Sequence, residues 1–246
     1  MKLIGLSGLA GSGKDTIADF LVEEYGFVKI SLSDVLKRVV RDVYGFTDNQ
    51  LWGPSEARNE PDRRYPRKCK QCWGGGSVQL GNGGYENPTE DCPSCDGKGT
   101  VYLTARHALQ TLGTEWGRNL CFPQTRTDYL LRQVETLAAN PYLTYNQKHG
   151  LRGKKTDSEE TLESIAGVVV PDLRFKNEIA EFRASALSPA LVRVVRPEAG
   201  LVGAAGQHIS EKEQTEIPDS DFDFIIQNDK TLGHLRGAVI AMMEQA

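Results

Sequence analysis

The sequence has little that would place the protein in a membrane or outside the cell. It contains no apolar run near 18 residues, the length that a membrane-spanning helix needs, and no basic leader followed by an apolar core. Strong charge is also missing, since 29 Lys and Arg against 33 Asp and Glu leave a formal net charge of −4. This balance argues against a general attraction to nucleic acid, although local basic patches remain compatible with it. We therefore expect an intracellular, cytoplasmic protein with no membrane partner.

Cysteine is scarce as well, with five in 246 residues, but four of them form two pairs of equal spacing. Cys69 and Cys72 make the first CxxC, and Cys92 and Cys95 make the second. Inside the cell such pairs favour a tetrahedral Zn²⁺ site, and disulfides are the alternative. Four thiolates leave no open position for water, so the zinc is expected to be structural. The fifth, Cys121, stands apart and is expected to be a small buried residue.

Both cysteine pairs continue as CxxCxGxG, which resembles the zinc modules of DnaJ-type co-chaperones. Glycines after the second cysteine would let backbone N–H groups approach the thiolates. The residues between the pairs are rich in glycine and polar side chains, so they cannot form an apolar core without the metal. Hydrophobic periodicity is lost from about residue 50 to residue 101. We therefore predict an insertion over residues 51–101, with a four-cysteine zinc module at 66–101.

The first sixteen residues have the order strand, glycine-rich loop and helix that is typical of a P-loop. An apolar run at residues 3–7 breaks into glycines that end on Gly-Lys, and an amphipathic pattern follows. Backbone N–H groups of such a loop surround phosphates, and the helix N-terminus adds partial positive charge. Asp15 occupies the usual hydroxyl position, so Thr16 is the alternative ligand of Mg²⁺. The residues expected to bind ATP and Mg²⁺ are Gly11, Ser12, Gly13, Lys14, Asp15 and Thr16.

The rest of the chain alternates helical and strand patterns, which predicts an α/β fold. We expect a P-loop NTPase with a mostly parallel sheet and helices on both faces. The expected strands are 3–7, 28–30, 165–170, 191–195 and 222–226; the expected helices are 15–25, 34–44, 104–116, 127–139, 175–187 and 232–243. Residues 1–50 and 102–246 would form this core, with the polar segment 144–165 as a mobile lid or a linker. Because Asp172 follows a buried strand, it should lie at the same sheet edge as the P-loop.

Five segments, taken in order, resemble bacteriophage-type deoxynucleoside monophosphate kinases. They begin at Leu9, Leu32, Leu112, Asp172 and His208 and read LAGSGKDT, LSDVLK, LGTEWGR, DLRFKNE and HISE. The resemblance implies ATP-dependent phosphorylation of a deoxynucleoside 5′-monophosphate with Mg²⁺, a homodimer, and the host cytoplasm for a phage protein. The zinc insertion is not a general feature of that family, and it falls where the monophosphate-binding region normally lies. It would therefore alter substrate choice, recruit a partner or only add stability.

Phosphoryl transfer to a phosphate needs positioning and charge neutralisation rather than a general base. Lys14 would neutralise the transferring phosphoryl group, and the planar fork of Arg174 suits two phosphate oxygens. Asp172 would support Mg²⁺ or order the acceptor, unless it only caps the following helix. Glu178 is expected either at the substrate or in a helical salt bridge.

Several residues are candidates for acceptor recognition, and some of them have alternative roles. Lys37 would face the monophosphate or solvent. Arg58 opens a basic stretch that reaches Lys70 and would hold a phosphate, contact nucleic acid or be solvated. Trp116 would stack on a base or lie in the core. Thr114 and Arg118 are assigned to the acceptor site by the resemblance.

Two other functions remain open. Another small-molecule P-loop kinase, such as a dephospho-coenzyme A kinase, would share the loop but respond to a pantetheine substrate. A zinc-containing adaptor for nucleic acid or protein, switched by ATP, would explain the basic stretch and the glycine-rich knuckles. Against the adaptor stand the acidic net charge and the LGTEWGR and DLRFKNE segments, which it would not need.

Overall fold

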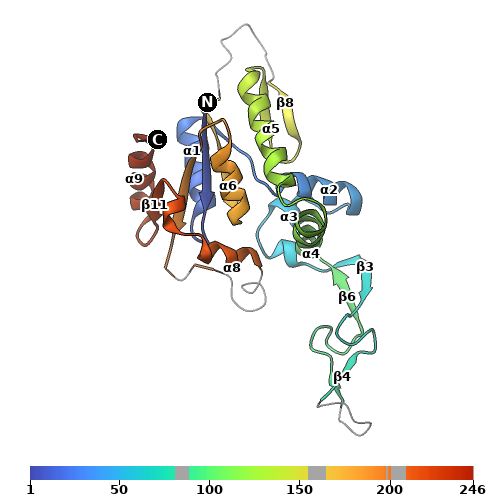
Figure 1. Cartoon of the computed structure of the whole chain (residues 1–246). Helices are drawn as coiled ribbons and strands as arrows, with labels where there is room; N and C mark the ends of the chain where they lie inside the picture. Colours follow the sequence, from blue (N-terminus) through green and yellow to red (C-terminus); the bar gives the residue numbers. More distant parts are fainter. Residues whose placement is uncertain (81–88, 155–164, 198, 201–208, 246) are drawn as a thin grey trace. The chain divides into compact units, whose positions relative to one another are not determined.

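The protein, described here from a computed structural model, forms two compact units (Figure 1). The structure describes residues 1–80, 89–154, 165–197, 199–200 and 209–245. The first unit comprises residues 1–38 and 117–246, and the second comprises residues 39–116. Helix α2 (Asp34–Tyr44) and helix η2 (Thr111–Cys121) each contribute residues to both units.

The first unit is built on a five-stranded, wholly parallel sheet with the strand order β11-β10-β1-β9-β2. The strands are β1 (Lys2–Ser7), β2 (Phe27–Lys29), β9 (Gly167–Leu173), β10 (Ala190–Val195) and β11 (Phe224–Gln227). The other elements are α1 (Lys14–Tyr25), α5 (Thr125–Ala139), β7 (Leu143–Asn146), β8 (Gly150–Gly153), α6 (Lys176–Ala184), α8 (Ile209–Glu216), η3 (Asp219–Asp221) and α9 (Leu232–Met243). The predicted α/β class with a parallel sheet is therefore confirmed.

Helices cover both faces of this sheet because successive strand residues point to opposite sides. In β1, Leu3 packs in a buried cluster with residues of α5 and α6, whereas Ile4 packs in a second cluster with residues of α1 and α9. The interior strand β9, between β1 and β2, is buried along nearly its whole length. This is the burial expected of a parallel strand between two helical layers.

The second unit has a small core of its own. Its elements are α3 (Asp48–Trp52), η1 (Ala57–Asn59), β3 (Asp62–Lys68), β4 (Ser77–Gln79), β5 (Thr89–Asp91), β6 (Thr100–Leu103) and α4 (Ala105–Gln110). Buried side chains of α2, α3, β6, α4 and the loop between α2 and α3 form one apolar cluster, which includes Val40, Phe46 and Leu51. This unit therefore begins before residue 51 and ends after residue 101, because residues outside that segment supply apolar side chains that it lacks.

Several predicted boundaries differ from the observed ones. The segment expected to be one helix over 104–116 is an α-helix only to Gln110, and a π-helix follows from Thr111 to Cys121. The Phe122 N–H donates to the Gly117 carbonyl, a spacing of five residues. Gly113 and Gly117 weaken the α-helical preference there, and π-helical turns are rare and often lie at functional sites.

Two more predictions concern the polar segment 144–165 and the final helix. The segment 144–165, predicted as a lid or a linker, begins within the antiparallel hairpin β7–β8, and its residues 155–164 lie outside the described residues. The final helix, α9, has the bounds expected from the sequence, 232–243. Among the described residues, no helix is both long and apolar enough to cross a membrane.

Candidate functional site

The glycine-rich loop leaves the carboxyl end of β1 and enters α1 through Gly13. Gly13 has a left-handed φ of 104° and ends the loop without a side-chain cap on the helix. A Cβ at this position would lie 2.4 Å from the Asn228 side chain, so only glycine fits. A Cβ at Gly11 would meet no atom within 4 Å, which leaves the outer rim of the loop open. The loop thus has the open, N–H-rich form that suits a phosphate group.

Lys14 begins α1 and turns its side chain back into the loop. Its residue is only 7% exposed, and its ammonium donates hydrogen bonds to the Leu9 carbonyl at 2.7 Å and to Ser12 Oγ at 3.3 Å. The Gly8 carbonyl also accepts from it. The structure therefore places a cation within the same loop as the backbone donors. Of the two candidate Mg²⁺ ligands, Asp15 is exposed and Thr16 is half-buried on the first turn of α1.

Asn228 supports the loop from β11 and was not identified from the sequence. Its side-chain amide donates to the Ser12 carbonyl at 2.9 Å, and its backbone N–H donates to the Val195 carbonyl at 2.7 Å. Asn228 directly follows a strand, at the sheet edge where ligands bind in parallel sheets. That position was the signal that could have identified it.

Asp172 lies near the end of β9, next to β1 in the sheet, so it shares the carboxyl edge with the P-loop as expected. Its carboxylate accepts hydrogen bonds from the backbone N–H groups of Leu32 (2.8 Å) and Ser33 (3.2 Å) and from the Ser31 hydroxyl. These groups belong to the loop between β2 and α2. Asp172 therefore holds that loop, rather than capping the helix that follows it in the sequence.

Arg174 comes directly after β9, and its neighbour Leu173 pairs with Ser7 at the end of β1. The P-loop and Arg174 thus leave adjacent strands at the same level. The turn that carries Arg174 is held by Glu178, whose carboxylate accepts from the backbone N–H groups of Arg174 (2.8 Å) and Phe175 (3.1 Å). Glu178 is buried and also pairs with Arg126 at 2.8 Å. Burial raises the pKa of this carboxyl, and Arg126 opposes the rise.

Arg118, from the LGTEWGR segment, contacts the DLRFKNE segment. Its guanidinium lies 3.8 Å from the centre of the Phe175 ring, and it donates to the Asn177 side chain at 2.6 Å. It also pairs with Glu213 at 3.4 Å. The two segments that carry most of the family resemblance are therefore in direct contact, and Arg118 helps position the start of α6.

Lys37 lies on α2 at 3.9 Å from the carboxylate of Asp34, which is completely buried. Asp34 accepts from the Ser31 backbone N–H and from the Tyr145 hydroxyl. Arg38 in turn donates to the Tyr145 hydroxyl at 3.0 Å. This network joins α2 to the hairpin β7–β8 and was not anticipated from the sequence, because its members are distant along the chain.

The remaining acceptor candidates lie in the second unit. Arg58 is half-buried in η1, and Thr114 is half-buried in the π-helix. Trp116 is 55% exposed, so the alternative that it is a core residue is wrong. Cys121, expected to be buried, is exposed because the π-helix ends there at the surface. His208, the first residue of the HISE segment, lies outside the described residues.

Glu181 gives this region a pH-dependent stability. Burial against α5, together with the negative charges of Asp128 and Glu178, raises the pKa of Glu181, which the Thr127 hydroxyl only partly offsets. A carboxyl whose pKa is higher in the folded protein than in the unfolded chain favours folding at low pH. Its contribution to the free energy of unfolding is complete below the unfolded pKa, about 4.3, and is lost as pH rises through the folded pKa. Glu181→Gln should therefore increase the free energy of unfolding at pH 7 relative to the native protein.

The measurement is urea unfolding of both proteins between pH 4 and pH 8, within the range where the fold persists. The advantage of Glu181→Gln should shrink toward zero at the acid end. The control, Glu135→Gln on the exposed side of α5, should change stability by less than about 0.5 kcal/mol at every pH. A constant advantage across the range would contradict the assignment.

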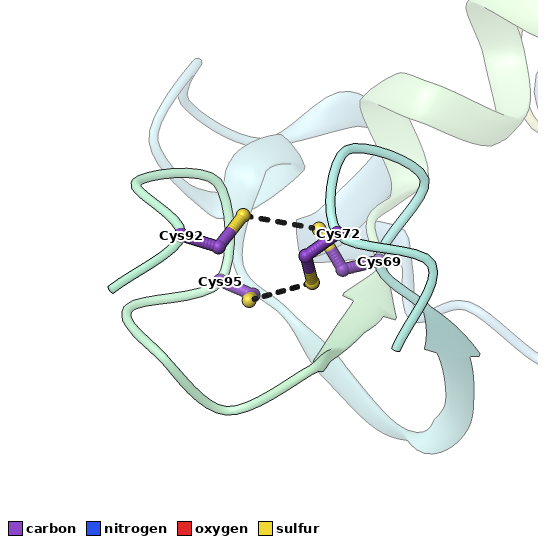
Figure 2. Close-up of side chains that lie close together, drawn as sticks. All are labelled: Cys69, Cys72, Cys92 and Cys95. Atoms are coloured by element: carbon purple, nitrogen blue, oxygen red, sulfur yellow. Dashed lines mark hydrogen bonds between the residues drawn. The ribbon is translucent and has the colours of Figure 1, made fainter. Parts of the chain in front are cut away.

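The four paired cysteines meet in one cluster (Figure 2). Their sulfur atoms all lie within 4.8 Å of one another, with Cys69–Cys92 and Cys72–Cys95 separations of 3.7 Å. A tetrahedron of Zn–S bonds near 2.3 Å has edges of about 3.8 Å. The separations are far longer than an S–S bond of about 2.05 Å, and all four cysteines are free thiols. The disulfide alternative is therefore wrong, and the cluster fits a zinc module.

Each CxxCxGxG segment, residues 69–76 and 92–99, forms one knuckle. Its glycines bring backbone N–H groups to the sulfur atoms, as the sequence predicted. The Gly76 N–H donates to Cys72 Sγ and the Gly99 N–H donates to Cys95 Sγ, both at 3.2 Å. A Cβ at Gly99 would lie 2.3 Å from the Gly74 carbonyl, so the two knuckles approach as closely as backbone allows. Such N–H···S bonds stabilise thiolates and orient them as metal ligands.

The metal-free thiols do not titrate alike. Burial raises the pKa of Cys92 to about 12. Burial also acts on Cys72, but N–H groups of Gly76 and Gly74 outweigh it and lower its pKa to about 7. Four thiolates would therefore not coexist here at neutral pH without a cation to offset their charge. A divalent soft metal supplies that charge and displaces the thiol protons.

No model of a known protein family matches the chain. Over its whole length, however, the chain is similar to a protein of Acanthamoeba polyphaga mimivirus named "Putative deoxynucleotide monophosphate kinase". The two are 27% identical over 246 residues, which are 100% of this chain and 98% of the viral protein.

Proposed function

We propose that this protein is a kinase that uses ATP and Mg²⁺ to phosphorylate deoxynucleoside 5′-monophosphates. The observation that carries the proposal is the pairing of Ser7 with Leu173, which brings the Lys14 loop and Arg174 out of adjacent strands at one sheet edge. The full-length similarity to the mimivirus protein supports a nucleotide kinase, and a kinase implies ATP. The family resemblance in the sequence adds the deoxynucleotide acceptor.

The chemistry needs few groups. At neutral pH the acceptor phosphate already carries the attacking anionic oxygen, so no side chain has to remove a proton. Backbone N–H groups of Gly11, Ser12 and Gly13 would bind the ATP phosphates. Lys14 and Arg174 would neutralise charge that develops on the transferring phosphoryl group. Mg²⁺, held through Thr16 or Asp15, would add further charge neutralisation and align the phosphates.

Other residues act on position rather than on the phosphates. Asp172 would order the acceptor through the loop 31–33 that it holds, and Glu178 would keep Arg174 in place. We assign Lys37 and Arg118 to acceptor recognition in the first unit. Thr114 is assigned to the same role by the resemblance, Arg58 by the basic stretch that it opens, and Trp116 by its exposed ring, which could stack on a base.

The remaining features of the proposal concern the whole protein. The cysteine cluster would hold one structural Zn²⁺ in an insertion of an otherwise ordinary kinase core. The protein would act as a homodimer in the cytoplasm. Light scattering at several concentrations would measure the mass of the assembly.

Arg174→Ala should lower turnover by roughly 100-fold or more while changing ATP affinity only slightly, because the arginine would act mainly in the transition state. Steady-state rates and ATP titration by calorimetry would measure the two effects. Arg183→Ala, which removes an exposed arginine farther along α6, should leave turnover nearly unchanged. Equal turnover of Arg174→Ala and the native protein would remove Arg174 from the mechanism.

The proposed reaction is tested by ADP release from ATP and Mg²⁺ in the presence of a panel of acceptors. The panel contains deoxynucleoside and ribonucleoside monophosphates and dephospho-coenzyme A. Stimulation by one or more deoxynucleotides is the expected result and would identify the base. Stimulation by dephospho-coenzyme A alone would contradict it, as would release that no acceptor affects.

A further inference from the structure

The two zinc knuckles have equivalent backbones, but their side chains differ in charge. Each residue of the first corresponds to the residue 23 positions later in the second, so that Cys69 matches Cys92 and Cys72 matches Cys95. Equivalent hydrogen bonds connect them: Cys69 N–H donates to the Gly99 carbonyl, and Cys92 N–H donates to the Gly76 carbonyl. The module is therefore close to two-fold symmetric in its main chain.

The symmetry pairs basic and aromatic residues of the first knuckle with acidic residues of the second. Lys68 corresponds to Asp91, and each side chain lies beside the glycine of its own knuckle, at 3.7 Å and 2.9 Å from a Cβ built there. Trp73 corresponds to Asp96. Lys70 has the uncharged Pro93 as its counterpart. The same backbone conformation carries cations and a tryptophan in the first knuckle and acidic residues in the second. We infer that the fold does not depend on the cations and the tryptophan of the first knuckle.

Trp73 is unusual in both conformation and exposure. Its φ is 53°, in the left-handed region that bulky residues rarely adopt, and Asp96 has the equivalent φ of 48°. The Trp73 residue is also 85% exposed. Asp is a far better residue for this conformation, and exposing an indole to water is unfavourable. A tryptophan at this position is explained by a partner that covers its ring.

We propose that the first knuckle and strand β3 bind single-stranded nucleic acid. Trp73 would stack on an unpaired base, and the lysines beside it would contact phosphates. This combination of an aromatic platform with a row of cations is how proteins hold single strands with little sequence preference. Among the described residues, Lys68 and Lys70 have no carboxylate within ion-pair distance, whereas Lys98 of the second knuckle pairs with Asp96 at 3.6 Å.

Two cations precede Trp73 along the chain, which favours a strand over a single nucleotide. Lys68 and Lys70 are both exposed, one on each side of Cys69. A strand that stacks one base on Trp73 could place successive phosphates near both lysines. A duplex would hide the base faces that the Trp73 ring needs, so an unpaired strand is the better fit. This inference does not depend on the proposed kinase reaction.

Fluorescence anisotropy of a labelled oligothymidylate of about 20 nucleotides, titrated with the full-length zinc-loaded protein without ATP, would test the proposal. We expect micromolar binding at low salt that weakens with a log–log slope near −2, as for about three neutralised phosphates. Trp73→Asp should weaken binding roughly 5- to 150-fold. Lys68→Ala combined with Lys70→Ala should make the slope shallower by about 1.4.

Controls separate this surface from the fold and from the kinase. Lys98→Ala, in the second knuckle, should bind like the native protein. Trp73→Asp should keep its zinc and its acceptor-stimulated ADP release, because the substituted residue is the one that the second knuckle already carries. The proposal is overturned if the native protein does not bind the oligonucleotide at low salt. It is equally overturned if Trp73→Asp binds as tightly as the native protein, or if a duplex competes more strongly than the single strand.

Discussion

Replacing Lys14 by alanine should abolish phosphoryl transfer, with turnover reduced by roughly 100-fold or more. The ammonium lies inside the loop, where it contacts the Leu9 carbonyl and Ser12 Oγ, while the Arg196 guanidinium reaches the Gly11 carbonyl at 3.4 Å. Without the ammonium, charge on the transferring phosphoryl group would be met by Arg174, backbone dipoles and Mg²⁺. The acceptor-stimulated ADP release described above measures the loss.

Lys14→Met is the matched variant, because it keeps an alkyl stem in the buried position and removes only the charge. Both variants should be inactive and folded, as judged by circular dichroism and by an unchanged zinc content. Lys230→Ala changes an exposed lysine near the loop-supporting Asn228 and should keep nearly full activity. Substantial turnover by Lys14→Met would exclude the lysine charge from the mechanism.

Replacing Cys69 by serine should release zinc and disorder the four-cysteine module that was predicted over residues 66–101. The buried apolar cluster around the knuckles consists of the cysteines themselves, with Val78 and Val101 against them. Structural zinc in small modules contributes on the order of 10–16 kcal/mol of apparent binding free energy, and a hydroxyl cannot replace a thiolate ligand. Metal analysis should fall from one zinc per chain to well below one.

Proteolysis and hydrogen exchange would locate the disorder. Protection should be lost over residues 66–80 and 89–101 and kept in β1 and β9, whose cores lie in the other unit. Cys121→Ser is the matched control, since this thiol is exposed and outside the cluster; it should retain the metal. Native protein that contains no zinc when purified under reducing conditions would contradict the zinc assignment.

Local sequence signals were sufficient for the main elements. The glycine loop, the apolar run of β9 and the amphipathic pattern of α9 each depend on residues close together in the chain. The paired CxxC spacing likewise predicted a four-sulfur cluster, because each pair forms one knuckle on its own. The π-helix was missed, since its hydrogen bonds differ from those of an α-helix by one residue and leave the polar pattern nearly unchanged.

By itself, the sequence determined the parallel α/β class, the glycine-rich loop between β1 and α1 and the four-cysteine cluster, because periodicity and short spacings encode them. Only the tertiary structure decided the contacts that join distant segments. Asp172 holds the loop after β2, Arg118 packs on Phe175, and Asn228 supports Ser12. These pairs are 57 or more residues apart in the chain and meet through strand order and helix packing. The structure also showed that the two CxxCxGxG segments share one backbone conformation but carry different side chains, because equivalent hydrogen bonds join them.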